Sequence, residues 1–153
     1  MPVNNELVGR EFAPTAPYLV GREKVREFAR AVFADAPQHT DVAAARAAGF
    51  ADVVAPPTFA MVVQDLTLQQ LLAEPDSGIV LARTIHAEQR FAYTRPIVAG
   101  DELTARLAVT GIRSLGGNAM ITSEATITDD AGEHVVTATS VLLVGSDDSE
   151  GDA

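Results

Sequence analysis

The groups of this chain that could transfer protons or attack a substrate are three histidines, a set of carboxylates, and serine and threonine hydroxyls. The chain has no cysteine, which removes thiolate nucleophiles, disulfides and cysteine-bound zinc or iron–sulfur clusters. It has no glycine-rich phosphate loop, no nucleophile elbow and no pair of histidines at the spacing of metal ligands. We therefore expect no metal site and no cofactor. General acid–base chemistry by histidine and carboxylate is what remains.

Asp35 and His39 stand four residues apart in the turn-rich segment DAPQHTD. A carboxylate and an imidazole in one loop can form an acid/base pair, because the protein environment can tune both groups toward neutral pH. The structural alternative is that Asp35 and Asp41 cap the ends of helices and that His39 is a surface turn residue. Spacing alone favours this alternative.

Pro57, Thr58 and Phe59 mark the entry to an apolar helix. The first N–H groups of a helix have no internal partner and carry the positive end of the helix dipole. Such an entry can polarise a carbonyl group or hold a developing oxyanion. The simpler interpretation is that Thr58 caps an ordinary core helix, and the entry by itself favours that interpretation.

The remaining polar candidates have ordinary structural interpretations. His86 lies in a strand-like run and His134 stands beside a hairpin loop, so neither is expected to be a ligand. Residues 95–101, RPIVAGD, break a strand and carry a glycine and an aspartate suited to a turn. We expect this segment to be structural as well.

The first half of the sequence indicates helices. Apolar residues at helical spacing predict an amphipathic helix over residues 23–33, and Asp41 and Gly49 as start and stop predict a short one over residues 41–48. A third helix over residues 59–73 is the most apolar and is expected to be buried. The stripe of the first helix consists of Val25, Phe28, Ala29 and Val32. One face of the third helix carries Phe59, Val62, Val63, Leu66 and Gln70, and much of the rest is filled by Ala60, Met61, Leu68 and Leu71.

The second half indicates strands. Apolar and polar residues alternate over residues 103–110 and 121–128, and a more continuous apolar run over residues 135–144 is typical of a central strand. Residues 84–93 predict an earlier strand, and turn residues between the runs predict hairpin loops. The expected fold class is therefore α+β, with a mostly antiparallel sheet of about five strands packed on one buried helix.

Composition restricts the partners. A chain of 153 residues suits one domain, and its net charge of −10 argues against nucleic acid, which binds basic faces. No apolar run approaches the ~20 residues of a membrane span, and the first residues lack the pattern of a signal peptide, so we expect a cytoplasmic protein with no membrane partner. Four acids, Asp147, Asp148, Glu150 and Asp152, lie in residues 145–153. We expect this tail to be disordered and residues 1–144 to form the single domain.

The order of several motifs resembles the MaoC-like, hotdog-fold dehydratase family. The motifs are VGREF at 8–12, PQHTD at 37–41, DVVAPPTF at 52–59 and HAEQRFAYTRPIVAGDEL at 86–103. The resemblance covers the chain to about residue 144 and is greatest to the small actinobacterial group that includes the accessory subunit of (R)-3-hydroxyacyl-ACP dehydratase. It implies a hotdog fold, in which the sheet wraps around the long helix, and a dimer with acyl-thioester sites at the subunit interface.

The resemblance also implies a catalytic loop, D-x-N-P-x-H, whose aspartate and histidine carry out reversible syn dehydration beside a carbonyl-polarising backbone N–H at the start of the central helix. Pro37 and His39 match this loop, but Ala34 and Ala36 stand where the aspartate and asparagine belong. Asp35 is one residue out of register. Either Asp35 acts through a shifted loop, or the chain is a non-catalytic partner that shapes the acyl tunnel. We favour the second, because a displacement of about 1 Å can cost ~10²-fold in rate.

The resemblance thus implies an (R)-3-hydroxyacyl-thioester dehydratase or enoyl-thioester hydratase of fatty acid metabolism, or its accessory subunit. His39 and Asp35 would be the catalytic candidates and residues 57–59 the substrate-binding ones. The partners would be acyl-CoA or acyl-ACP and a second subunit, in a homodimer or in a heterodimer with a catalytic hotdog subunit. Hotdog folds also carry thioesterases, for which Asp65 on the central helix is the candidate carboxylate. A protein that binds acyl thioesters without turnover is the third alternative.

Overall fold

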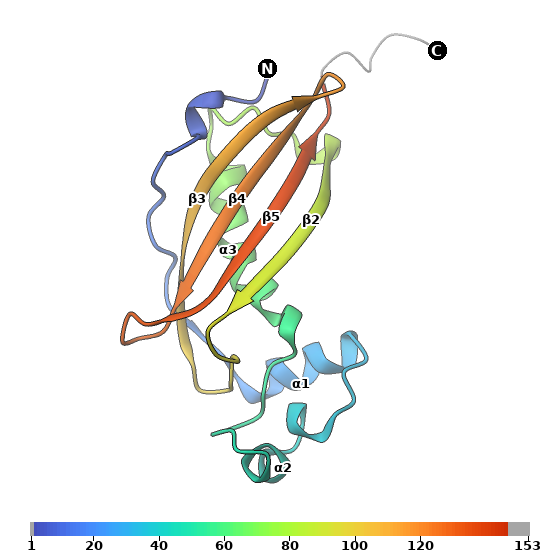
Figure 1. The fold of residues 1–153 in the computed structure, drawn as a ribbon, viewed down its shortest axis with the longest axis vertical. Coiled ribbons are helices and arrows are strands. Elements are labelled where there is room, and N and C mark those ends of the chain that lie inside the picture. The colour runs from blue at the N-terminus through green and yellow to red at the C-terminus, as the bar shows by residue number, and fades with distance from the viewer. Residues whose placement is uncertain (1, 147–153) are drawn as a thin grey trace.

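The computed structural model describes residues 2–146, which form a curled antiparallel sheet wrapped around one long helix (Figure 1). Short 3-10 helices precede and separate the main elements. The α-helices are α1 (Arg22–Ala31), α2 (Val42–Ala47) and α3 (Ala60–Ala73). The strands are β1 (Tyr18–Leu19), β2 (Thr84–Tyr93), β3 (Glu102–Leu115), β4 (Asn118–Thr128) and β5 (His134–Val144). The α+β prediction and the implied hotdog fold are confirmed.

The two edges of the sheet differ. The strand order within the described residues is β1-β3-β4-β5-β2, and every pairing is antiparallel. The N-terminal segment covers the free side of β3, where the Gly9 N–H donates to Val109 O over 3.1 Å and the Thr15 N–H to Ala105 O over 2.9 Å. The opposite edge, β2, has no strand on its outer side in the described part of the chain. Only one edge of the sheet is therefore open.

Helix α3 crosses the concave side of the sheet (Figure 1). Its fully buried side includes the apolar Val63 and Leu71 and also two polar residues, Gln64 and Thr67, whereas Leu66 is only partly buried. The Gln64 side chain donates to Ala138 O over 3.4 Å and the Thr67 hydroxyl donates to Gln64 O over 2.6 Å. Buried polar groups are tolerated where they are hydrogen-bonded. The apolar pattern of the sequence did not indicate these two buried polar residues.

A polar layer divides the core. One apolar cluster gathers around the start of α3 and includes Phe59, and the other gathers around its end and includes Leu71. In β4 and β5 the positions between the two clusters carry Ser123 and Ser140, whose buried hydroxyl oxygens lie 3.0 Å apart. Gln64 occupies the matching level of α3. The helix and the sheet thus meet through hydrogen bonds at mid-height.

The two short helices match their predictions in part. Asp41 caps α2 as expected, with its carboxylate accepting from the Ala43 N–H over 2.9 Å. Helix α1 ends earlier than expected, because Phe33 adopts a left-handed backbone with a φ of 58°. A helix cannot continue through that conformation. As a result Val32 is exposed and the Phe33 side chain is 90% exposed.

Residues 145 and 146, which we expected to begin the tail, are hydrogen-bonded to the domain. The Gly145 N–H donates to Arg83 O over 2.8 Å and the Ser146 N–H to the Asn118 side chain over 3.3 Å. The rest of the expected tail lies outside the described residues. Within residues 2–146, no helix combines the length and the apolar character that crossing a membrane requires.

Candidate functional site

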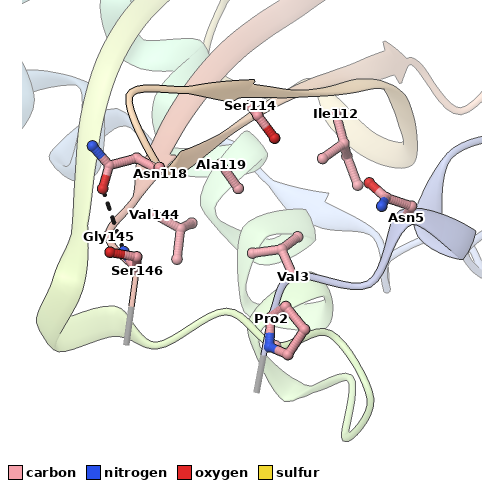
Figure 2. Close-up of a pocket in the computed structure, with 12 residues that line it drawn as sticks. Pro2, Val3, Asn5, Ile112, Ser114, Asn118, Ala119, Val144, Gly145 and Ser146 are labelled. Carbon is pink, nitrogen blue, oxygen red and sulfur yellow. Dashed lines mark hydrogen bonds between the residues drawn. The ribbon is translucent and has the colours of Figure 1, made fainter. Parts of the chain in front are cut away.

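Two hollows at opposite ends of the molecule are candidates for the site. One hollow, of about 340 Å³, lies where the N-terminal residues meet the β3–β4 hairpin and the end of β5. Figure 2 shows the residues that line it. Asn118 and Ser146 are hydrogen-bonded at its rim. None of the described residues that line it has a titratable side chain. This hollow therefore offers no side chain for proton transfer.

The second hollow, of about 430 Å³, contains His39, and we call it the His39 pocket. Three segments far apart in the sequence form it: the loop between α1 and α2, the extended segment before α3, and the end of β2 with the loop that follows. The residues that line it are Gln38, His39, Val54, Ala55, Pro57, Tyr93, Thr94, Arg95, Pro96 and Ile97. A histidine and a tyrosine in a mostly apolar pocket make this the candidate site.

His39 is held by the backbone in front of it. Pro37 begins the 3-10 helix Pro37–His39, which presents the imidazole to the extended segment before α3. The Nδ1 of His39 lies 2.6 Å from Val54 O, and the Val54 N–H donates to Gln38 O over 2.9 Å. A carbonyl oxygen can only accept, so Nδ1 carries the proton. In the neutral form of the ring, Nε2, which has no partner among the described residues, therefore carries the lone pair.

Tyr93 lies at the end of β2 and reaches the start of the central helix. Its hydroxyl donates a hydrogen bond to Pro57 O, in the turn that leads into α3. Burial raises the pKa of Tyr93 to about 12, partly offset by the nearby Ala60 N–H. The phenol therefore stays neutral at physiological pH.

Arg95 lines the pocket, but its charge is already paired. Its guanidinium donates to both carboxylate oxygens of Asp101, at 2.8 and 3.1 Å, and to Asp129 at 3.3 Å. Asp101 also accepts from the Val98 N–H over 2.9 Å, which closes the turn. These bonds raise the pKa of Arg95, and the hydrogen bond to Asp101 has the largest effect. The segment 95–101 thus has the structural role that we expected, and Arg95 brings no unpaired charge to the pocket.

The other proposed catalytic residue, Asp35, lies elsewhere. It lines a separate shallow hollow together with Phe33 and Ala34. Its side chain is exposed and forms no hydrogen bond or ion pair with the described residues. Asp35 is not among the residues that line the His39 pocket. The structure therefore does not bring the two candidates together.

The three proposed substrate-binding residues have different positions. Pro57 lines the His39 pocket, and Thr58 is exposed and does not. Phe59 is fully buried and packs edge to face on Phe28, with ring centres 5.3 Å apart. Sequence analysis missed Tyr93, although a signal was available, since this residue ends the predicted strand 84–93, two residues before the strand break.

The remaining candidates stay outside the pocket. Asp65 is exposed on α3, where its carboxylate accepts from Gln69 over 2.7 Å. His86 contacts Gln89 on its own strand, and His134 contacts threonine hydroxyls on both sides. Residues 2–146 contain no group of three or more histidines and carboxylates arranged to hold a metal ion.

A curled antiparallel sheet around one long helix is the hotdog fold of MaoC-like dehydratases. The family described as "FAS1-like, dehydratase domain region" matches residues 6–138, and the chain belongs to this family. The resemblance stated from the motifs is confirmed.

Relatives and solved structures agree with this assignment. A UPF0336 protein of Clavibacter michiganensis subsp. michiganensis is 64% identical over 149 residues, which cover 97% of this chain and 100% of that protein. A UPF0336 protein of Streptomyces avermitilis is 46% identical, with coverage of 94% and 95%. A solved MaoC-like dehydratase matches 92% of this chain at 40% identity and a TM-score of 0.82, although this chain spans only 43% of that protein. The C-terminally truncated HadBC (3R-hydroxyacyl-ACP dehydratase) complex of Mycobacterium tuberculosis matches 87% of this chain at 32% identity, with a TM-score of 0.78, and 92% of that chain is covered.

Proposed function

We propose that this chain is an accessory subunit of a hotdog (R)-3-hydroxyacyl-thioester dehydratase of fatty acid metabolism. The family and the hydratase-like neighbours support the class of reaction. The accessory role rests on one observation: the His39 pocket holds a histidine with a free Nε2, but no carboxylate is among the described residues that line it. Dehydration needs one group for the α-proton and a second for the departing hydroxyl. The pocket supplies only the first.

The lining of the pocket supports a neutral thioester as its ligand. Arg95 is paired with two carboxylates, and the remaining walls are largely apolar. A free carboxylic acid would therefore meet no unpaired cation there. The Thr58 N–H, in the turn that opens α3, has no acceptor among the described residues, and it lies at the positive end of the helix dipole. A thioester carbonyl directed toward that turn would be polarised.

The open edge of the sheet supports a second subunit. Proteins usually pair, cover or charge an exposed edge strand. Here the N-terminal segment covers β3, whereas the whole length of β2 is open within the described residues. The similarity to a chain of the heteromeric HadBC complex supports an assembly with a different subunit. We propose a heterodimer with a catalytic hotdog subunit, with the homodimer as the alternative, in the cytoplasm.

Two alternative functions follow from the same pocket. A thioesterase would use Asp65, but that residue is exposed and does not line the His39 pocket. An acyl-thioester-binding protein without turnover is the stronger second candidate, because a pocket with one proton-transfer group can bind without reacting.

The hydration of crotonyl-CoA tests the proposal. We expect a negligible rate for the purified protein and no further loss in His39→Ala. The double variant Ala34→Asp with Ala36→Asn restores the loop motif, and we expect it to raise the rate by about 10²-fold, the lower end of general acid–base effects. His86→Ala, an exposed histidine on β2, is the matched control and should have the same rate as the wild type. Rapid turnover by the wild type that both His39→Ala and Asp35→Ala abolish would identify Asp35 as the working acid and contradict the accessory role.

A further inference from the structure

We propose that Tyr93 is a specificity-determining residue, through which the His39 pocket selects thioesters whose acyl group donates a hydrogen bond, the 3-hydroxyacyl form, over saturated ones. This inference rests on the proposed function and names the ligand that the same pocket prefers. The selection depends on which donor and acceptor atoms of the pocket have no partner within the protein and so can bind a ligand.

His39 and Tyr93, two of the polar side chains that line the pocket, direct their protons into the protein. The Nδ1–H of His39 donates to Val54 O over 2.6 Å, and the only proton of the Tyr93 hydroxyl is donated to Pro57 O. A neutral imidazole keeps one acceptor nitrogen. The Tyr93 oxygen, which donates to Pro57 O and lies beside the Ala60 N–H, keeps one further lone pair. These two residues therefore offer a ligand two acceptor atoms, the Nε2 of His39 and the hydroxyl oxygen of Tyr93.

The strongest potential donor of the lining is occupied. Four N–H bonds of Arg95 are directed to Asp101, to Asp129 and to Pro96 O. The Thr94 hydroxyl lies 2.5 Å from the Nδ1 of His134, outside the pocket lining. The Gln38 carboxamide can donate or accept, so it favours neither kind of ligand. Acceptors therefore outnumber free donors around the pocket.

The two acceptors lie within reach of one small ligand. Val54 O and Pro57 O are three residues apart, and three residues span at most roughly 11 Å of extended chain. His39 and Tyr93 both line one pocket of about 430 Å³. A short acyl thioester can therefore reach the Tyr93 oxygen with a hydroxyl while its other end lies near His39. A saturated acyl group has no donor with which to do so.

Isothermal titration calorimetry with a pair of ligands tests the inference on the full-length protein. (R)-3-Hydroxybutanoyl-CoA and butanoyl-CoA share the same carrier and differ only in the hydroxyl. We expect the wild type to bind the hydroxy form about 3- to 10-fold more tightly, the range of one neutral hydrogen bond. In Tyr93→Phe we expect this ratio to fall to nearly one. If Tyr93 had only a structural role, its substitution would weaken the binding of both ligands equally and leave the affinity ratio unchanged.

Controls separate the inference from the proposed function. Tyr18→Phe removes the other tyrosine hydroxyl of the chain, which does not line the pocket, and should keep the wild-type ratio. Because Tyr93→Phe could fold poorly, a second measurement uses wild-type protein with ¹³C-labelled tyrosine, and we expect the hydroxy ester to shift the Tyr93 ring signal more than butanoyl-CoA does. Equal binding of both esters by the wild type, or an unchanged ratio in Tyr93→Phe, overturns the role of Tyr93 and leaves the proposed function standing. If neither ester binds, both the role of Tyr93 and the proposed function are overturned.

Discussion

His39 donates its Nδ1 proton to the carbonyl oxygen of Val54 over a distance of 2.6 Å. The orientation of the imidazole is therefore set by the backbone of the segment before α3, and no acidic side chain is needed for it. This bond holds the histidine in a defined position although no carboxylate is among the described residues that line its pocket. The same bond attaches the loop between α1 and α2 to the entry of the central helix.

Acid should destabilise the fold. The pKa of Asp52 is lowered chiefly by the hydrogen bond from Arg22, that of Asp76 by the bond from Arg10, and that of Asp129 by the Glu133 N–H. A carboxyl whose folded pKa lies below its unfolded value stabilises the protein above the unfolded pKa and loses that contribution as pH falls through the folded pKa. We therefore expect the melting temperature, followed by circular dichroism, to fall progressively as the pH drops below about 4, the ordinary pKa of an aspartate.

A variant of Arg22 tests how much of this acid sensitivity comes from the Arg22–Asp52 pair. Arg22→Ala removes the principal partner of Asp52 and should reduce the loss of melting temperature on acidification. Lys24→Ala, with only an exposed contact of 3.7 Å to Glu27, is the control and should behave as the wild type. An Arg22→Ala protein with an unchanged acid profile would show that the Asp52 pair does not contribute.

The polar layer should contribute to stability. Gln64 accepts from the Gln89 amide over 2.8 Å and donates to Ala138 O, and its side chain is fully buried. Gln64→Leu leaves these partners unsatisfied, which we expect to cost about 1–3 kcal/mol in the free energy of unfolding, measured with urea. Gln69→Leu, on the exposed side of the same helix, should change it by less than about 0.5 kcal/mol. An equal or greater stability of Gln64→Leu would mean that the layer is dispensable.

The protein should not be a monomer. The open edge of β2 carries Ile85, which is 62% exposed. Light scattering should show a mass of about twice the 16.1 kDa of one chain, or association with a copurified second subunit. Ile85→Lys should weaken the assembly, whereas Leu115→Lys, at an equally exposed apolar position beside the β3–β4 turn, should not. A particle of 16.1 kDa at micromolar concentration, with no affinity for a second subunit, would contradict this prediction.

A chelator of metal ions should not change the thermal stability of the protein. The chain lacks cysteine, and residues 2–146 bring no three potential ligands together. We expect the melting temperature to be the same with and without excess EDTA. Elemental analysis that finds stoichiometric zinc or iron in the purified protein would refute the expectation.

The sequence by itself determined the fold class and the family. The change from helical to alternating periodicity, the cap at Asp41 and the order of the motifs depend on neighbouring residues and need no knowledge of packing. These features are local, so a linear pattern contains them. That Ala34 and Ala36 stand where the family's loop has an aspartate and an asparagine stays a prediction from the resemblance.

Only the tertiary structure decided which side chains reach the pocket and which enter the core. Gln64 is buried because its partner Ala138 lies on a strand 74 residues further along the chain. Tyr93 meets Pro57, 36 residues before it, and His39 meets Val54, 15 residues after it. Phe59 turns into the core although its neighbour Pro57 lines the pocket. Hydrogen-bond partners so far apart in sequence are brought together by folding alone, and local periodicity carries no information about them.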